Sequence, residues 1–326
     1  MHAVLEELRK IGIIPVIKID DASKAVPLAK ALIAGGIPCA EVTFRTAQGE
    51  EAMRLINSEL CSGAVPGILL GAGTVLTTEQ VDKAIAAGAK FIVSPGFNPK
   101  VVSYCVEKGI PVTPGCSTPS DIEKALEFGL EVVKFFPAEQ AGGLEYIKAI
   151  AAPYTTVSFI PTGGINAQNI ASYIAYDRVI ACGGSWMVSA DLINAGEFDT
   201  ISALCREAQL KLLGFQMVHI GINTENEEAA LKAANRFAAL FGFKNKDGNS
   251  SIFSGDGIEI MKSPYLGKYG HIAIATNSVL RARAFFEREG VEFNAESVKK
   301  DPRGNLIAIY FKEEIGGFAV HLVQKK

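Results

Sequence analysis

Short β-rich runs alternate with helical patterns of ten to fifteen residues from Ile11 to about Leu213, and this alternation limits the fold more than any other feature. Repeated βα units of this kind build a parallel sheet covered by helices. Eight such units in about 200 residues predict a compact (β/α)₈ TIM barrel, an α/β fold, with a doubly wound sheet as the alternative. The expected strands are Ile13 to Ile19, Cys39 to Phe44, Ile68 to Gly71, Phe91 to Ser94, Pro111 to Pro114, Glu131 to Phe135, Thr156 to Ile160 and Arg178 to Ala181.

Lys134 stands at the end of the strongly apolar sixth strand. A lysine in apolar surroundings is desolvated, and a desolvated ammonium releases its proton more easily than one in water. The neutral amine is the form that attacks a carbonyl and forms a Schiff base. The alternative is a strand-terminal lysine whose side chain extends into solvent.

A barrel gathers its catalytic groups at the carboxyl ends of its strands, and other polar residues fall at the ends of the expected strands. Glu41 on the second strand could move protons, directly or through a water. Arg45 and Thr74 could hold the carboxylate of a 2-oxo acid, because a guanidinium matches a carboxylate as a two-pronged donor. Alternatively, Glu41 and Arg45 form only a structural ion pair.

A Schiff base on Lys134 could cleave a carbon–carbon bond next to a carbonyl, and a metal-dependent aldol mechanism is the alternative. That mechanism generally uses histidine ligands, and residues 1–213 contain only His2, in the N-terminal helix pattern. This favours a Schiff base. Glycine pairs in Pro161-Thr-Gly-Gly-Ile165 and Gly183-Gly-Ser-Trp186 follow the seventh and eighth expected strands. Each pair is expected to lead into a helix start and to bind phosphate through backbone N–H groups; the alternative is an ordinary tight turn.

After Gly214 the pattern becomes β-rich and reads as two βαβββ units in succession, an α+β domain. Three of the four histidines of the chain and one glutamate lie in its strands, each flanked by apolar residues: His219, Glu259, His271 and His321. Such side chains point away from the face that packs on the helices, so the four could meet at one metal ion. Alternatively, each is a structural residue with its own partner. The predicted domains are residues 1–213 and 215–326.

Composition excludes several classes of function. A net charge of −3 without a basic stretch argues against nucleic acid, and no apolar run approaches the ~20 residues that span a bilayer. The N-terminus lacks the pattern of a signal peptide, so we expect a cytoplasmic protein with a small-molecule partner. The six cysteines have no CxxC spacing and are expected to be reduced and buried.

Six motifs in order across residues 1–213 resemble the 2-dehydro-3-deoxy-6-phosphogluconate (KDPG) aldolase family. They are Glu41-Val-Thr-Phe-Arg-Thr46, Gly71-Ala-Gly-Thr-Val75, Ser94-Pro-Gly96, Val133-Lys-Phe-Phe-Pro-Ala-Glu139, Pro161-Thr-Gly-Gly164 and Gly183-Gly-Ser-Trp186. The resemblance implies a class I aldolase without a cofactor, usually a homotrimer. It would cleave the phosphorylated 2-oxo sugar acid to pyruvate and glyceraldehyde 3-phosphate, and often 4-hydroxy-2-oxoglutarate to pyruvate and glyoxylate.

The resemblance also implies a role for each matching residue. Lys134 would be the Schiff-base lysine and Glu41 the acid/base, while Arg45 and Thr74 would bind the pyruvate carboxylate. The phosphate would bind at Gly163, Gly164, Gly184 and Ser185. Pro95 and Phe136 would line the pocket, and Lys18 would attract the phosphate. Whether the substrate belongs to the gluconate or the galactonate series stays open.

Residues 215–326 resemble the vicinal oxygen chelate superfamily, which includes glyoxalase I, epimerases and extradiol dioxygenases. The metal ligands of that superfamily occupy the same strand positions, so the resemblance nominates His219, Glu259, His271 and His321. Three imidazoles and one carboxylate suit a divalent transition metal such as zinc, nickel, manganese or iron. A glutamate is common in the superfamily at the last position, which leaves the metal and the reaction open.

Two hypotheses follow for each domain. The barrel is a Schiff-base aldolase or, alternatively, a phosphate-binding barrel isomerase in which Lys134 acts only through its charge. The second domain is a metalloenzyme or, alternatively, a non-catalytic binding or assembly module.

Overall fold

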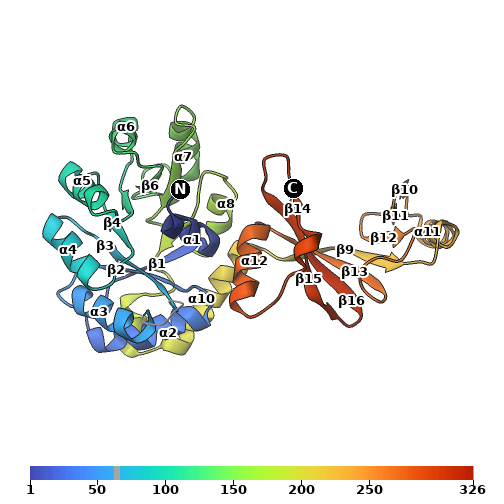
Figure 1. Cartoon of the computed structure of the whole chain (residues 1–326), viewed down its shortest axis with the longest axis horizontal. Coiled ribbons are helices and arrows are strands. Elements are labelled where there is room, and N and C mark those ends of the chain that lie inside the picture. Colours follow the sequence, from blue (N-terminus) through green and yellow to red (C-terminus); the bar gives the residue numbers. More distant parts are fainter. Residues whose placement is uncertain (62–66, 326) are drawn as a thin grey trace. The chain divides into compact units, whose positions relative to one another are not determined.

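The computed structural model describes residues 1–61 and 67–325. They divide into two compact units, Met1–Leu212 and Leu213–Lys326, which Figure 1 draws in blue to yellow and in yellow to red. No helix in the described ranges is both long enough and apolar enough to cross a membrane.

The described part of the first unit contains eight parallel strands. Their bounds are β1 Ile13–Ile17, β2 Cys39–Thr43, β3 Leu69–Gly73, β4 Phe91–Ser94, β5 Val112–Pro114, β6 Val132–Phe135, β7 Ser158–Pro161 and β8 Cys182–Gly184. Ladders join β5-β4-β3-β2-β1-β8 and β6-β7. Parallel bridges Gly115–Lys134 and Thr162–Gly183 connect these two groups, so the strands follow one another around a ring. The α/β barrel predicted for this region is therefore observed.

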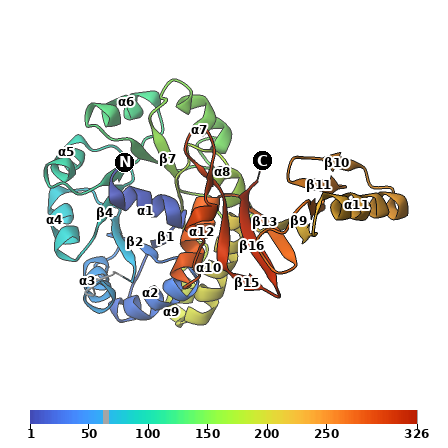
Figure 2. The same ribbon diagram turned by 45° about the vertical axis from the view of Figure 1, so that its right-hand side comes forward.

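Helices alternate with these strands, and Figure 2 shows most of them around the ring, with the N-terminal helix drawn across its middle. Their bounds are α1 Ala3–Ile11, α2 Ala25–Ala34, α3 Gly49–Leu60, α4 Thr78–Ala86, α5 Pro99–Glu107, α6 Pro119–Glu127, α7 Gly143–Ala151, α8 Ile170–Ile174, α9 Ala190–Ala195 and α10 Phe198–Leu213. Several begin at capping residues that accept a backbone N–H, such as Thr77, Asn98 and Thr118. The apolar face of each helix can then pack on the strands, because the cap fixes where the helix begins.

The eighth strand differs from its prediction, whereas the other seven differ by at most two residues at either end. Arg178 to Ala181 is not a strand: only Val179 forms an isolated bridge, to Phe159. The Arg178 guanidinium binds the carbonyl of Val157, which ties this segment to the loop before β7. The strand that pairs with β1 is Cys182–Gly184, because Ile13 is in register with Cys182.

Two glycines predicted to form a turn therefore lie inside β8. A Cβ at Gly183 would lie 2.4 Å from Thr162 Oγ1, and one at Gly184 would lie 1.9 Å from the Trp186 ring. Glycine is unfavourable in strands, which is why its propensity predicted a turn here. The side chains of Thr162 and Trp186 occupy the space beside the backbone of these two glycines. Tertiary packing thus outweighs the low strand propensity of glycine.

The second unit contains an eight-stranded sheet in its described residues, in the order β10-β11-β12-β9-β13-β16-β15-β14. The bounds of its elements are β9 Gln216–Asn223, α11 Glu227–Phe241, β10 Asn245–Asp247, β11 Ser251–Ser254, β12 Ile258–Met261, β13 Gly270–Thr276, α12 Val279–Arg288, β14 Lys299–Lys300, β15 Leu306–Ile315 and β16 Phe318–Gln324. Each half runs strand, helix, three strands, and the halves meet where β9 and β13 pair antiparallel. This is the connection expected of paired βαβββ units.

The helices of the second unit pack on one face of the sheet. Ala230 and Ala234 of α11 form a small core with Ile252 and Ile260, and α12 contacts β15 and β16. Because side chains alternate across a strand, the residues next to Ile252 and Ile260 in β11 and β12 point to the opposite face. That face carries Glu259, beside His219 and His271.

Candidate active site and candidate metal centre

Lys134 and Glu41 lie together in the first unit. Lys134 is in β6 and Glu41 in β2, and their side chains are 8% and 3% exposed. Lys134 Nζ lies 3.8 Å from Glu41 Oε1, and that oxygen is buried without a hydrogen-bond partner among the described residues. The alternative in which Lys134 extends into solvent is therefore wrong. A buried amine beside an unsatisfied carboxylate oxygen is an arrangement that can transfer protons at a substrate.

Gly73, which the sequence analysis did not single out, makes room for this carboxylate. A Cβ at Gly73 would lie 2.2 Å from Glu41 Oε1, a distance that no side chain tolerates. The next residue, Thr74, has φ 56°, in the left-handed region that β-branched residues rarely adopt. Outliers of this kind concentrate at functional sites. Gly73 lies beyond the predicted strand Ile68 to Gly71, and the sequence signal for it was the glycine-rich segment Gly71-Ala-Gly-Thr-Val75.

Arg45 is exposed and is held by a neighbour on its own segment. Its Nε donates to Thr43 Oγ1 at 3.1 Å, and Thr43 Oγ1 donates to the Ile17 carbonyl at 2.7 Å. Within the described residues, the ion-pair partner of Glu41 is Lys134 and not Arg45. The alternative of a structural Glu41–Arg45 pair is thus wrong, and Thr43 is a contact that sequence reasoning missed.

Three further predicted residues lie at the ends of their strands. Lys134 Nζ is 5.2 Å from the centroid of the Phe136 ring, which is 39% exposed. Pro95 is half-buried, and its carbonyl leaves no space for a Cβ at Gly115. Lys18 is not a free cation, because its Nζ pairs with Asp20 at 2.9 Å, and the hydrogen bond from Lys18 lowers the pKa of that carboxyl.

The two glycine segments expected to bind phosphate lie next to each other, since Thr162 bridges to Gly183. Gly163 and Gly164 have φ of 99° and 78°, and Ser185 is exposed directly after Gly184. The prediction that each pair leads into a helix start is wrong. The next helices, α8 and α9, begin at Ile170 and Ala190 and are only five and six residues long. Any anion would bind here through backbone N–H groups of the loops rather than through a helix terminus.

The thiols of the first unit fit a packing role. Five of the six cysteines are buried, and Cys61 is half-buried. Burial raises the pKa of Cys116, which lies near the candidate site residues, to about 12. A thiol with this pKa is protonated at neutral pH and is a poor nucleophile.

The four candidate ligands of the second unit converge on the polar face of the sheet. They come from four neighbouring strands, β12, β9, β13 and β16. One ring nitrogen from each of the three histidines lies within 4.8 Å of the others. Glu259 Oε2 lies 3.2 Å from His219 Nε2 and 3.1 Å from His271 Nε2.

The chemistry of this cluster, which we call the His–Glu cluster, fits a divalent transition metal. His321 Nε2 is buried without a hydrogen-bond partner in the described part of the chain. Burial and the neighbouring His271 and His219 lower the pKa of His321 to about 3, so its ring is neutral and offers a lone pair. Burial alone would raise the pKa of Glu259, but hydrogen bonds to His219, His271 and Ser251 outweigh it and keep the carboxylate ionised. Neutral imidazoles and a carboxylate are the ligand forms that such a metal requires.

Neighbours that sequence reasoning missed fix these rings in place. The Tyr310 ring stacks on His321 with centroids 4.4 Å apart, and Phe253 meets His219 edge to face at 5.5 Å. A Cβ at Gly221 would lie 2.0 Å from the His271 ring, so only a glycine leaves room for that ligand. Their signal in the sequence was weak, because aromatic and glycine residues in strands have many other uses.

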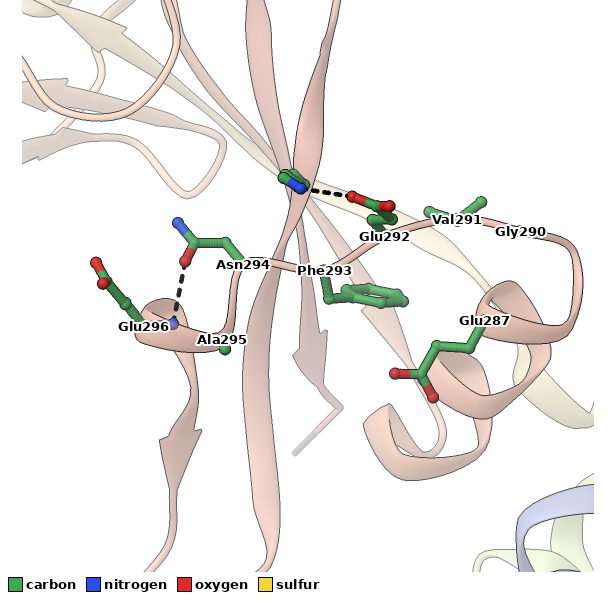
Figure 3. Close-up of a pocket in the computed structure, with 9 residues that line it drawn as sticks. Glu287, Gly290, Val291, Glu292, Phe293, Asn294, Ala295 and Glu296 are labelled. Atoms are coloured by element: carbon green, nitrogen blue, oxygen red, sulfur yellow. Dashed lines mark hydrogen bonds and ion pairs between the residues drawn. The ribbon is translucent and has the colours of Figure 1, made fainter.

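A separate hollow lies at the end of α12, shown in Figure 3. It is lined by Glu287, Gly290, Val291, Glu292, Phe293, Asn294, Ala295, Glu296 and Lys312. Two of its charged groups pair with each other, since Lys312 Nζ binds Glu292 at 2.6 Å. None of the predicted site residues lines it.

Comparison with known proteins identifies the first unit. The family model described as "KDPG and KHG aldolase" matches residues 4–204. A 2-dehydro-3-deoxy-phosphogluconate aldolase of Treponema pallidum is 52% identical over 66% of this chain and 99% of its own length. The KHG/KDPG aldolase of Escherichia coli K12 is 44% identical over 60% of this chain and 90% of its own length.

The fold of the first unit is also similar to that of a solved structure. The KDPG aldolase of Legionella pneumophila, crystallised with pyruvate captured at low pH as a covalent carbinolamine intermediate, is 37% identical, with a TM-score of 0.60 over 64% of this chain and 98% of that one. The prediction of an enzyme of the aldolase class, a carbon–carbon lyase, is confirmed by these relatives. The matched region, its relatives and its barrel agree, and the chain belongs to the KDPG and KHG aldolase family.

Proposed function

We propose that the first unit is a class I aldolase that cleaves 2-dehydro-3-deoxy-6-phosphogluconate to pyruvate and glyceraldehyde 3-phosphate through a Schiff base on Lys134. The observation that carries this proposal is the buried Lys134 side chain, whose Nζ lies 3.8 Å from a Glu41 carboxylate oxygen that has no hydrogen-bond partner among the described residues. The carbinolamine captured in the Legionella relative supports the same class of mechanism.

The proposed steps use two side chains of the protein, Lys134 and Glu41. Neutral Lys134 Nζ attacks the C2 carbonyl carbon, and loss of water from the carbinolamine gives an iminium. As the C4 hydroxyl loses its proton, the C3–C4 bond breaks and its electrons enter the iminium to form an enamine, which releases the aldehyde. Protonation of the enamine at C3 and hydrolysis then release pyruvate. Glu41, 3.8 Å from Nζ, accepts and returns the protons, directly or through a water.

The remaining predicted residues would position the substrate. Arg45, oriented by Thr43, and Thr74 would hold the carboxylate next to C2. The loops at Gly163, Gly164, Gly184 and Ser185 would bind the phosphate at the other end. Phe136 and Pro95 would form the wall, and Lys18, already paired with Asp20, would add a weaker attraction for phosphate.

The description of the matching family names KHG as well as KDPG aldolases, which supports 4-hydroxy-2-oxoglutarate as a second substrate, cleaved to pyruvate and glyoxylate. A homo-oligomer, with a trimer favoured, and a cytoplasmic location stay predictions.

Reductive trapping tests the mechanism. Incubation with pyruvate and borohydride is expected to add a stable adduct at Lys134, which peptide mass spectrometry locates. The absence of an adduct on the folded protein would sink the Schiff base. It would favour the alternative of a phosphate-binding barrel isomerase in which Lys134 acts only through its charge.

For the second unit we propose a metal-binding domain of the vicinal oxygen chelate superfamily, with His219, Glu259, His271 and His321 as ligands. The paired βαβββ connection and the convergence of the four side chains support it. A bound zinc, nickel, manganese or iron ion would supply Lewis-acid or redox chemistry. Metal analysis of the purified chain tests the proposal, and a chain free of metal after growth with adequate metal would favour a non-catalytic binding or assembly module.

A further inference from the structure

We propose that Ser251 is a positioning residue that makes Glu259 a one-oxygen ligand in the His–Glu cluster. The inference rests on the metal site proposed above and adds a residue outside the ligand set. It follows from how the two carboxylate oxygens of Glu259 are divided between neighbours.

The strand register places Ser251 on the ligand face. In the antiparallel pair β11–β12, Ser251 is opposite Met261 and Phe253 is opposite Glu259. Ser251 and Glu259 are therefore diagonal neighbours on one face, within reach of each other's side chains. Ile252 and Ile260 alternate to the other face, where they pack on α11.

The two oxygens of Glu259 have separate partners. Ser251 Oγ donates a hydrogen bond to Oε1 at 2.6 Å. Oε2 faces the histidines, 3.2 Å from His219 Nε2 and 3.1 Å from His271 Nε2. With Oε1 engaged by the serine, Oε2 is the oxygen left to bind a metal. The protein then offers four donor atoms, three imidazole nitrogens and one oxygen.

Burial makes this hydrogen bond effective. Ser251 is 7% exposed, so water competes little for the hydroxyl, and a hydrogen bond to an ionised carboxylate is of the stronger kind. Groups that orient a metal ligand typically change metal affinity by about 10- to 100-fold when they are removed.

The same strand offers a matched control. Ser254 is fully buried, and its Oγ has no hydrogen-bond partner among the described residues. Its position alternates away from that of Ser251, and it is paired with Ile258 rather than with a ligand. Ser254→Ala therefore removes the same atom from the same strand without touching Glu259.

The experiment measures Co²⁺ and Zn²⁺ dissociation constants of the full chain by chelator competition, together with the Co²⁺ absorption spectrum. We expect Ser251→Ala to bind each metal about 10- to 100-fold more weakly and to change the Co²⁺ bands, because the freed Oε1 changes how the carboxylate binds. Ser254→Ala is expected to match the wild type, and Ser251→Thr to restore affinity and spectrum.

The outcomes separate the two proposals. If the wild type binds no stoichiometric metal, the metal site itself is wrong and the role of Ser251 falls with it. If the wild type binds metal and Ser251→Ala has the same affinity and spectrum, only the positioning role is overturned. Should Ser251→Ala fail to fold, the nearly isosteric pair Ser251→Thr and Ser251→Val gives the same comparison, since the two differ by the hydroxyl.

Discussion

The two candidate sites treat their carboxylates in opposite ways. In the barrel, Glu41 Oε1 is buried 3.8 Å from Lys134 and has no hydrogen-bond partner in the part of the chain that the structure describes. In the second unit, both oxygens of Glu259 are engaged, and the buried atoms of the His–Glu cluster that lack a hydrogen-bond partner among the described residues are ring nitrogens, His271 Nδ1 and His321 Nε2. A carboxylate oxygen without a fixed hydrogen bond suits proton transfer, whereas a fully oriented carboxylate among imidazoles suits a metal ion that stays bound.

Both sites nevertheless use glycine in the same way. Gly73 leaves room for the Glu41 carboxylate, and Gly221 leaves room for the His271 ring. In each case the glycine lies on the strand beside the functional residue, where the side chain crosses a neighbouring backbone. Close packing thus makes room for a candidate catalytic pair and for a candidate ligand set by one physical means, the absence of a Cβ.

The largest effect should come from Lys134→Met. Loss of the amine removes the nucleophile, so we expect KDPG cleavage to fall by about 10³-fold or more and the borohydride adduct to vanish. Metal content of the second unit should not change. Near-normal cleavage by the variant, measured in a coupled assay of pyruvate release, would show that Lys134 is not the nucleophile.

Glu41→Gln should lower kcat by about 10²- to 10⁴-fold, the usual contribution of an acid/base group. Lys134 remains, so the pyruvate adduct should still form, more slowly. Steady-state kinetics and timed borohydride trapping separate the two effects. Unchanged kcat would mean that another group moves the protons.

His271→Ala should weaken metal binding by about 100-fold or more, because it removes a ligand at the centre of the His–Glu cluster. The borohydride adduct at Lys134 is expected to form as in the wild type. Metal analysis after dialysis and peptide mass spectrometry report the two results on one sample. A matching loss of the adduct would contradict two independent sites.

Gly73→Ala should lower kcat by about 10- to 100-fold without unfolding the barrel, because the new Cβ must displace the Glu41 carboxylate from its place beside Lys134. Gly96→Ala is the control, since a Cβ at Gly96 meets nothing within 4 Å. Equal kcat in the two variants would show that the position of Glu41 is not critical.

The smallest effect should be a pH dependence of stability in the metal-free chain. The folded pKa of His321 is lowered to about 3 from 6.5, so the unfolded chain binds the proton first. This contribution to stability is present above about pH 6.5 and is lost as the pH falls toward 3. We expect the thermal midpoint of the wild type to drop by a few degrees between pH 7 and 6, at about 4–8 °C per kcal/mol for a unit of this size. His321→Asn should show a smaller drop, and an equal drop would assign the effect elsewhere.

Much of the fold could be predicted from the sequence because the apolar periodicities are strong. Seven barrel strands, the second-unit connection and the positions of Lys134 and Glu41 in strands follow from local patterns. The eighth strand could not be predicted, because Gly183 and Gly184 have low strand propensity and pair only where Ile14, Pro15 and Thr162 are placed beside them. The prediction of a helix start directly after each glycine pair was also wrong. Loops of five residues separate Gly164 from α8 and Gly184 from α9.

The sequence by itself determined the order of the elements, the lysine at the end of an apolar strand, and a histidine or glutamate in each of four strands. Only the tertiary structure decided which atoms meet: Glu41 with Lys134 rather than Arg45, and Ser251 with one oxygen of Glu259. The physical reason is that periodicity fixes the face on which a side chain lies. The partners of a side chain depend on strand register and on the space left by neighbours such as Gly73 and Gly221. Neither factor can be read from the local sequence around the side chain.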